Sequence, residues 1–190
     1  MRLDLRLMLG STVLAGALGG KAAFEALLSE LSAEPGEPET VFVDFAHVEV
    51  ATASFLRESV LALRDYLRSR RSNHYPIVAN ANSVVLEELV ELLRPRGDAV
   101  MTCSLDARNE VSALVPIGIL DPKQRQTFEL VLKHGETDAG TLMRLYGESE
   151  GTKHTTAWNN RLASLATLGL VIEQANGRAK RYRPLLARAA

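Results

Sequence analysis

Hydrophobic and polar positions along residues 1–119 follow two alternating periods, which predict strands and helices in turn. Residues 2–9 alternate polar and apolar side chains, the pattern of a half-buried strand. The runs 40–45 and 76–80 are almost continuously apolar and indicate strands inside a sheet. Residues 99–105 and 110–119 form a last strand pair, joined by a polar turn.

Helical periodicity separates these predicted strands. One stripe consists of Phe24, Leu27, Leu28 and Leu31, which follow a glycine-dense stretch. In the segment 55–71 a second stripe of Leu56, Val60, Leu63 and Leu67 leaves the arginines on the other side. A third amphipathic helix covers 83–94 and stops before Pro95. The order predicts an α/β domain over residues 1–118, with helices packed on a mostly parallel, mixed sheet.

A smaller α+β domain is predicted for residues 119–190. Asp121 and Pro122 are a typical helix start, with a side-chain acceptor followed by proline at the first helical position. Thr137 is expected to cap a second helix, and a third follows the polar segment 147–151. Asn176-Gly177 is the strongest short hairpin signal, because a tight type I′ turn needs positive φ at both central positions. Three helices followed by a hairpin are therefore expected.

Composition excludes several classes of protein. The chain has 190 residues, 46% apolar and 24% charged, which is ordinary for a soluble globular protein. No apolar stretch reaches membrane-spanning length, and the first residues lack the apolar core of a signal peptide, so a cytoplasmic location is predicted. The single cysteine, Cys103, excludes an intramolecular disulfide and is expected to be a buried small hydrophobe.

The net charge of −1 conceals an acidic part and a basic part. Residues 1–120 carry 11 basic against 16 acidic side chains, a net of −5, and residues 121–190 carry 11 against 7, a net of +4. Five basic side chains are concentrated in the last thirteen positions: Arg178, Lys180, Arg181, Arg183 and Arg188. Such a cluster next to a hairpin turn favours contact with nucleic acid, although a solubilising tail has the same composition.

The third helix of this basic part has two distinct sides. Trp158, Leu162 and Leu165 fall within about 40° of one line and are predicted to be buried. The opposite side carries small or hydrogen-bonding residues: Lys153, Thr156, Asn160, Ala163 and Ser164. This side could enter a DNA major groove, where Asn pairs with adenine, while Asn159 and Arg161 flank it within reach of phosphates. A solvated helix surface is the alternative reading.

Residues 121–186 resemble the winged helix-turn-helix domains of bacterial regulators, through the stretch LASLATLGLVIEQANGRAKRYRP. The resemblance implies binding to double-stranded DNA. Lys153, Thr156, Asn160 and Ser164 would enter the groove, and the wing residues Arg178, Lys180, Arg181 and Arg183 would contact phosphates. Such domains also serve as protein-binding modules. A palindromic operator would require a homodimer, for which the sequence shows no dedicated helix.

The stretch VFVDFAHVEVATASFLRESV resembles STAS-like domains, whose strand ends in Asp-Phe and whose next helix starts at Ser-Phe, here Asp44-Phe45 and Ser54-Phe55. The resemblance implies a non-enzymatic docking domain like the anti-sigma factor antagonists, with an ATPase-fold kinase or a sigma-pathway component as partner. Ser54 aligns with the serine that is phosphorylated there. Two roles stay open for Ser54, phosphoacceptor or helix cap. This sequence has Thr52-Ala53 where the antagonists carry Asp-Ser.

Catalytic chemistry is not expected. The stretch 14–24 approaches a phosphate-binding loop, but Ala15 replaces its first glycine and Ala22 replaces its magnesium-binding hydroxyl. No set of catalytic side chains stands out, no cofactor is implied, and His47 and His74 are expected in loops rather than in a metal site. The sequence therefore predicts a DNA-binding transcriptional regulator controlled by a STAS-like domain. The alternative is a protein-interaction switch whose winged helix binds protein.

Overall fold

The computed structural model describes residues 1–152, 154–176 and 179–186. The chain divides into two compact units, residues 1–119 (unit 1) and 120–190 (unit 2). The fold is mixed α/β with a mostly parallel central sheet. None of the helices in the described ranges combines the length and the apolar character needed to cross a membrane.

Unit 1 is built on a five-stranded sheet in the order β1-β3-β5-β6-β7. Its strands are β1 (Arg2–Asp4), β3 (Glu39–Asp44), β5 (His74–Ala79), β6 (Ala99–Leu105) and β7 (Val111–Gly118). The first four are parallel, and β7 pairs antiparallel with β6. The predicted strands over 40–45, 76–80, 99–105 and 110–119 are thus confirmed.

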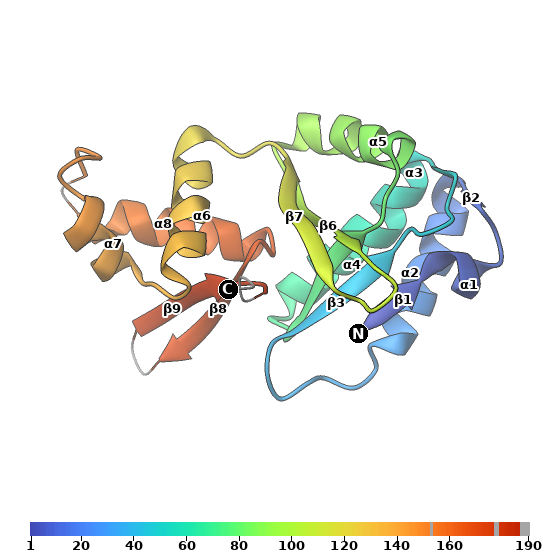
Figure 1. Cartoon of the computed structure of the whole chain (residues 1–190), viewed down its shortest axis with the longest axis horizontal. Helices are drawn as coiled ribbons and strands as arrows, with labels where there is room; N and C mark the ends of the chain where they lie inside the picture. Colours follow the sequence, from blue (N-terminus) through green and yellow to red (C-terminus); the bar gives the residue numbers. More distant parts are fainter. Residues whose placement is uncertain (153, 177–178, 187–190) are drawn as a thin grey trace. The chain divides into compact units, whose positions relative to one another are not determined.

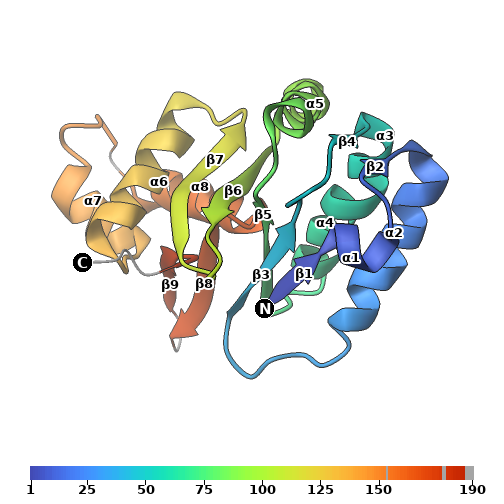
Figure 2. The same ribbon diagram turned by 45° about the vertical axis from the view of Figure 1, so that its right-hand side comes forward.

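The helices of unit 1 cover one face of this sheet (Figures 1 and 2). Because consecutive parallel strands step across the sheet in one direction, right-handed crossovers place the connecting helices on the same side. These helices are α2 (Gly16–Glu30), α3 (Ala53–Leu56), the π-helical turn η1 (Arg57–Leu61), α4 (Ala62–Ser69) and α5 (Ser83–Leu93). A 3₁₀ turn, η2 (Arg94–Arg96), follows α5. Their apolar sides join β1, β3 and β5 in one core.

Two segments of unit 1 differ from the prediction. The expected strand over 2–9 stops at Asp4, whose carboxylate accepts a hydrogen bond from the Leu7 amide at 2.9 Å and caps the helix α1 (Leu5–Leu9). The second difference is a short parallel pair, β2 (Val13–Leu14) with β4 (Val50–Ala51). Period-two alternation therefore overestimated the first strand, because a local side-chain cap outweighs it.

The glycine-dense stretch forms the first turns of α2. Gly16 has a φ of +77°, a conformation that glycine adopts at little cost. At Gly20 a Cβ would lie 2.6 Å from the carbonyl oxygen of Phe55, so only glycine allows α2 to pack this closely on α3. The prediction that these glycines serve turns and close packing is confirmed at both positions.

Buried charges anchor the sheet of unit 1. Arg64 donates through Nη1 and Nη2 to the two carboxylate oxygens of Asp98 at 2.8 and 2.7 Å, and both side chains are almost fully buried. Asp44 is fully buried and accepts from Arg2 at 2.6 Å and from Asn80 at 2.8 Å. The sequence predicts the arginines of 55–71 on the side of the helix opposite the apolar stripe, but the ion pair with Asp98 leaves Arg64 buried.

Cys103 and His74 both belong to strands and are both buried. Burial, together with the charge of Asp44, raises the pKa of the Cys103 thiol to about 11, so it stays protonated at neutral pH. Its prediction as a buried hydrophobe is confirmed. His74 was expected in a loop but is the first residue of β5 and is only 1% exposed. His47 lies in a turn and is exposed, as predicted.

The described residues of unit 2 form three helices and an antiparallel hairpin. The elements are α6 (Pro122–His134), α7 (Ala139–Tyr146), α8 (Thr155–Thr167), β8 (Val171–Asn176) and β9 (Ala179–Pro184). Asp121 caps α6 in a capping box with Gln124, and Pro122 occupies the first turn, as the sequence indicated. The cap of α7 is Asp138, because its carboxylate accepts from the Thr141 amide at 2.8 Å; the prediction of Thr137 is wrong.

Thr137 has a different role. It lies between α6 and α7 and forms an isolated β-bridge with Tyr182. Its backbone N–H donates to the Tyr182 carbonyl at 2.9 Å, and the Tyr182 N–H donates back at 2.8 Å. The bridge joins the α6–α7 connection to β9. Asn176 pairs with Ala179 at the end of the hairpin, and Gly177 of the predicted turn lies outside the described residues.

Candidate functional site

The candidate site of unit 2 is the solvent side of α8 together with the β8–β9 hairpin (Figure 1). Trp158, Leu162 and Leu165 are 0% exposed, which confirms the predicted buried side of α8. Tyr182 and Val171 of the hairpin belong to the same interior. This apolar packing fixes α8 and turns its remaining side outward.

The outward side of α8 carries hydroxyl and amide side chains. Thr156, Asn159 and Asn160 are exposed and make no side-chain hydrogen bond within the described part of the chain. Their donors and acceptors are therefore free for an external partner. Lys153, predicted at the start of this side, lies outside the described residues.

Ser164 is placed differently from these three. It is half-buried, and its hydroxyl accepts a hydrogen bond from the Gln124 amide nitrogen of α6 at 2.7 Å. The structure brings Thr156 and Asn160 to one exposed surface, whereas the hydroxyl of Ser164 is occupied at the contact with α6. Helical angles alone could not show this, because the partner belongs to another helix.

The two sides of the hairpin hold different basic residues. Side chains alternate along a strand, so Lys180 and the buried Tyr182 share one face of β9, and Arg181 and Arg183 share the other. The predicted wing residues therefore do not form one surface. Arg178, the fourth of them, lies outside the described residues.

Carboxylates lie beside two of these cations. Arg181 Nη1 is 2.5 Å from Glu136 Oε1, and Lys180 Nζ is 2.8 Å from Glu173 Oε1. The hydrogen bond to Glu136 raises the pKa of Arg181, and the charge of that carboxylate adds to the shift. Among the described residues, Arg183 donates only to the neutral amide of Gln174, at 3.4 Å. The positive field near the hairpin is thus weaker than the count of basic residues suggests.

A cluster around Glu150 holds α6, α8 and the connection before α8 together. Glu150 accepts from Lys123 Nζ and from Gln126, each at 2.6 Å, and lies 3.7 Å from Arg161. The hydrogen bond from Lys123, and after it the one from Gln126, lower the pKa of Glu150. The Arg161 guanidinium also lies over the Trp158 ring at 4.7 Å. Arg161 therefore supports the packing of α8.

The candidate residue of unit 1, Ser54, is in the first turn of α3. The cap of this helix is Thr52 rather than Ser54, since Thr52 Oγ1 accepts from the Phe55 amide. Ser54 is half-buried, and its hydroxyl lies 3.2 Å from Thr52 Oγ1. Glu88 Oε2 of α5 accepts from the Ala53 amide at 3.0 Å. A carboxylate thus already occupies the helix terminus, where it would repel a phosphate on Ser54.

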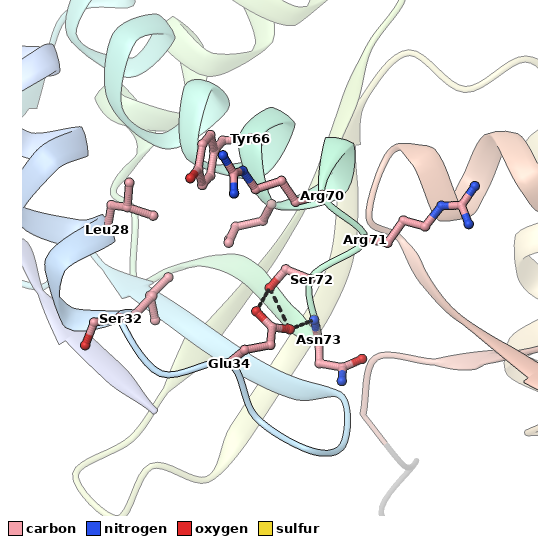
Figure 3. Close-up of a pocket in the computed structure, with 10 residues that line it drawn as sticks. Leu28, Ser32, Glu34, Tyr66, Arg70, Arg71, Ser72 and Asn73 are labelled. Atoms are coloured by element: carbon pink, nitrogen blue, oxygen red, sulfur yellow. Dashed lines mark hydrogen bonds between the residues drawn. The ribbon is translucent and has the colours of Figure 1, made fainter.

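Unit 1 also contains a hollow that the sequence did not reveal (Figure 3). It lies where α2 and α4 end, and its apolar lining consists of Leu28, Leu31, Leu67 and Tyr66. Glu34 accepts from Ser72 Oγ at 2.8 Å and from the Asn73 amide. The Arg70 guanidinium stacks on the Tyr66 ring at 4.7 Å, while Arg71 points away from the other labelled side chains.

Comparison with known proteins gives no relative: no protein-family model matches the sequence, and no curated protein matches it. The resemblances to STAS-like and winged helix-turn-helix domains therefore rest on the sequence motifs.

Proposed function

We propose that the chain is a DNA-binding transcriptional regulator. In this proposal, α8 reads base edges in the major groove of double-stranded DNA and the β8–β9 hairpin contacts phosphates. Unit 1 is a sensing or protein-docking domain that controls the occupancy of DNA. No catalytic step is part of the proposal.

The observation that carries the proposal is the free amide surface of α8. Asn160 is exposed on the side of the helix opposite Trp158, and the adjacent Asn159 is exposed at the flank of that side. Amide side chains can donate to and accept from adenine at the same time. The described neighbours of Asn160 on this side, Thr156 and Ala163, have small side chains that would enter a groove roughly 12 Å wide.

The topology of unit 2 supports the same interpretation. The order is helix, β-bridge, helix, helix and hairpin, with the bridge at Thr137 joined to β9. A winged helix-turn-helix domain has this order, and its third helix enters the groove. Arg181 and Arg183, on one face of β9, would then contact phosphates, once Glu136 releases Arg181.

For unit 1 we propose a regulatory role without phosphorylation of Ser54. The Glu88 carboxylate at the start of α3 would repel a phosphate there. The hollow beside Tyr66 and Arg70 offers an apolar surface and a guanidinium without a carboxylate partner among the described residues. A small effector with an apolar body and an anionic group would fit these surroundings.

A second candidate function is a protein-interaction switch, in which unit 2 binds protein and unit 1 serves a kinase or sigma-factor circuit. The carboxylates beside Lys180 and Arg181 favour it, since they reduce the charge available to DNA phosphates. This candidate predicts little affinity for duplex and no dependence of binding on released counterions. Titrating labelled duplex at two salt concentrations separates the two functions.

Replacing Asn160 with alanine is expected to relax base preference at one position of a duplex selected from a random pool. Loss of a bidentate contact to adenine should reduce discrimination there by about 1–3 kcal/mol. The matched control is Asn159→Ala, which removes the same group one residue away and should weaken all sequences alike. Selection of duplexes by each variant, followed by fluorescence anisotropy, measures both effects. Unchanged preference in Asn160→Ala would contradict the assignment of α8.

A further inference from the structure

The solvent side of α2 is unusually apolar for the outer side of a surface helix. Its centre is formed by Leu18, Ala22 and Ser29, all of which are exposed. Leu18 is 84% exposed, more than any other large hydrophobic side chain in the described ranges. A surface helix normally carries charged and polar residues on this side.

The opposite side of α2 already forms the core contact of unit 1. Gly20, Ala23 and Leu27 are buried there, and Gly20 is packed against the backbone of Phe55. The helix is therefore apolar on two sides, although its own unit covers only one. Exposed apolar side chains also occur on the two elements that precede α2 in the chain, with Leu7 of α1 78% exposed and Val13 of β2 52% exposed.

Two opposite charges flank the apolar side of α2 along the same margin. Lys21 and Glu25 are both exposed, and neither forms an ion pair within the described parts of the chain. They are one turn apart, so each lies about 60° to 100° from Ala22 around the helix. The other margin is formed by Gly19 and Ala26, which are small and uncharged, and by the exposed Glu30 at the end of the helix.

We propose that α2 is a homodimer interface, in which it packs antiparallel against α2 of a second copy of this chain. In an antiparallel pair related by a two-fold axis, the same margin of each helix faces its counterpart. A two-fold axis at the level of residue 23 along the helix places Lys21 of each copy opposite Glu25 of the other. The arrangement is self-complementary in charge, and the small residues allow close approach around Leu18.

The inference is independent of the proposed function, because the oligomeric state is measured without DNA. Sedimentation equilibrium of the full chain, up to about 0.1 mM, is expected to show a dimer. Leu18→Glu should raise the dissociation constant at least tenfold. Leu18 is exposed, so the variant should fold, and far-UV circular dichroism checks this. The control is Leu145→Glu, at an exposed leucine of α7, which should leave the dimer unchanged.

A charge exchange tests the antiparallel arrangement. Lys21→Glu should weaken the dimer by placing four carboxylates together, and Lys21→Glu with Glu25→Lys should restore it. A wild-type monomer at the highest concentration would overturn the proposal, as would a dimer that survives Leu18→Glu. Weakening by Lys21→Glu without restoration in the double variant would overturn the antiparallel pairing.

Discussion

Replacing Trp158 with alanine is expected to lower the free energy of unfolding of unit 2 by about 3–5 kcal/mol, because it empties the centre of a small core. Trp158 is 0% exposed and packs beside Leu162 and Leu165. Loss of this packing would also leave α8 less firmly held, and the proposed function requires that its polar side stay in place. Urea unfolding followed by far-UV circular dichroism measures the change.

Trp158→Phe is the matched control for this prediction. The Trp158 indole N–H is buried and has no hydrogen-bond partner among the described atoms, which is itself unfavourable. Phenylalanine keeps most of the aromatic volume and removes that donor, so the loss should be clearly smaller than for alanine. An alanine variant within about 1 kcal/mol of the wild type would show that Trp158 does not hold α8 in place.

Replacing Asp98 with alanine is expected to destabilise unit 1 by about 3–5 kcal/mol, since it leaves the buried Arg64 charge without its main partner. Arg64 also interacts with Asp65 at 2.7 Å, but that carboxylate is half exposed. Asp65→Ala is therefore the control and should cost less than about 1 kcal/mol. Chemical denaturation of both variants gives the comparison, and equal losses would contradict the assigned roles.

Periodicity predicted much of the framework of unit 1. The runs around β3 and β5 are apolar because these strands lie inside the sheet, and α5 has a clear amphipathic stripe. Both patterns can be recognised from neighbouring residues along the chain, without knowledge of distant contacts. The alternating pattern over 2–9 is also local, but it did not predict the end of the strand, because the Asp4 side chain caps a helix there.

Contacts between distant residues could not be predicted in this way. Arg64 lies on the polar side of its helix by period, yet Asp98, 34 residues later, draws it into the interior. The hydrogen bond from Gln124 to Ser164 and the ion pair between Arg181 and Glu136 likewise join separate elements. For the candidate site, the sequence indicated the buried side of α8 but not which hydroxyls and cations have internal partners.

The pairing of the hairpin cations changes what the charge count means. Residues 121–190 have a net charge of +4, but Glu136 and Glu173 lie within ion-pair distance of Arg181 and Lys180. Phosphates would have to replace these carboxylates. The proposal therefore requires that the hairpin arginines exchange an internal partner for DNA, which gives a measurable dependence on salt.

The most direct test of the proposed function is the affinity of the full chain for duplex DNA at about 50 and 200 mM salt. We expect binding that weakens steeply as salt rises. In the variant Arg181→Ala with Arg183→Ala, the slope of log affinity against log salt should fall by about 2, because two phosphate contacts are lost. Absence of binding at the lower salt concentration, or an identical slope in the variant, would contradict the account.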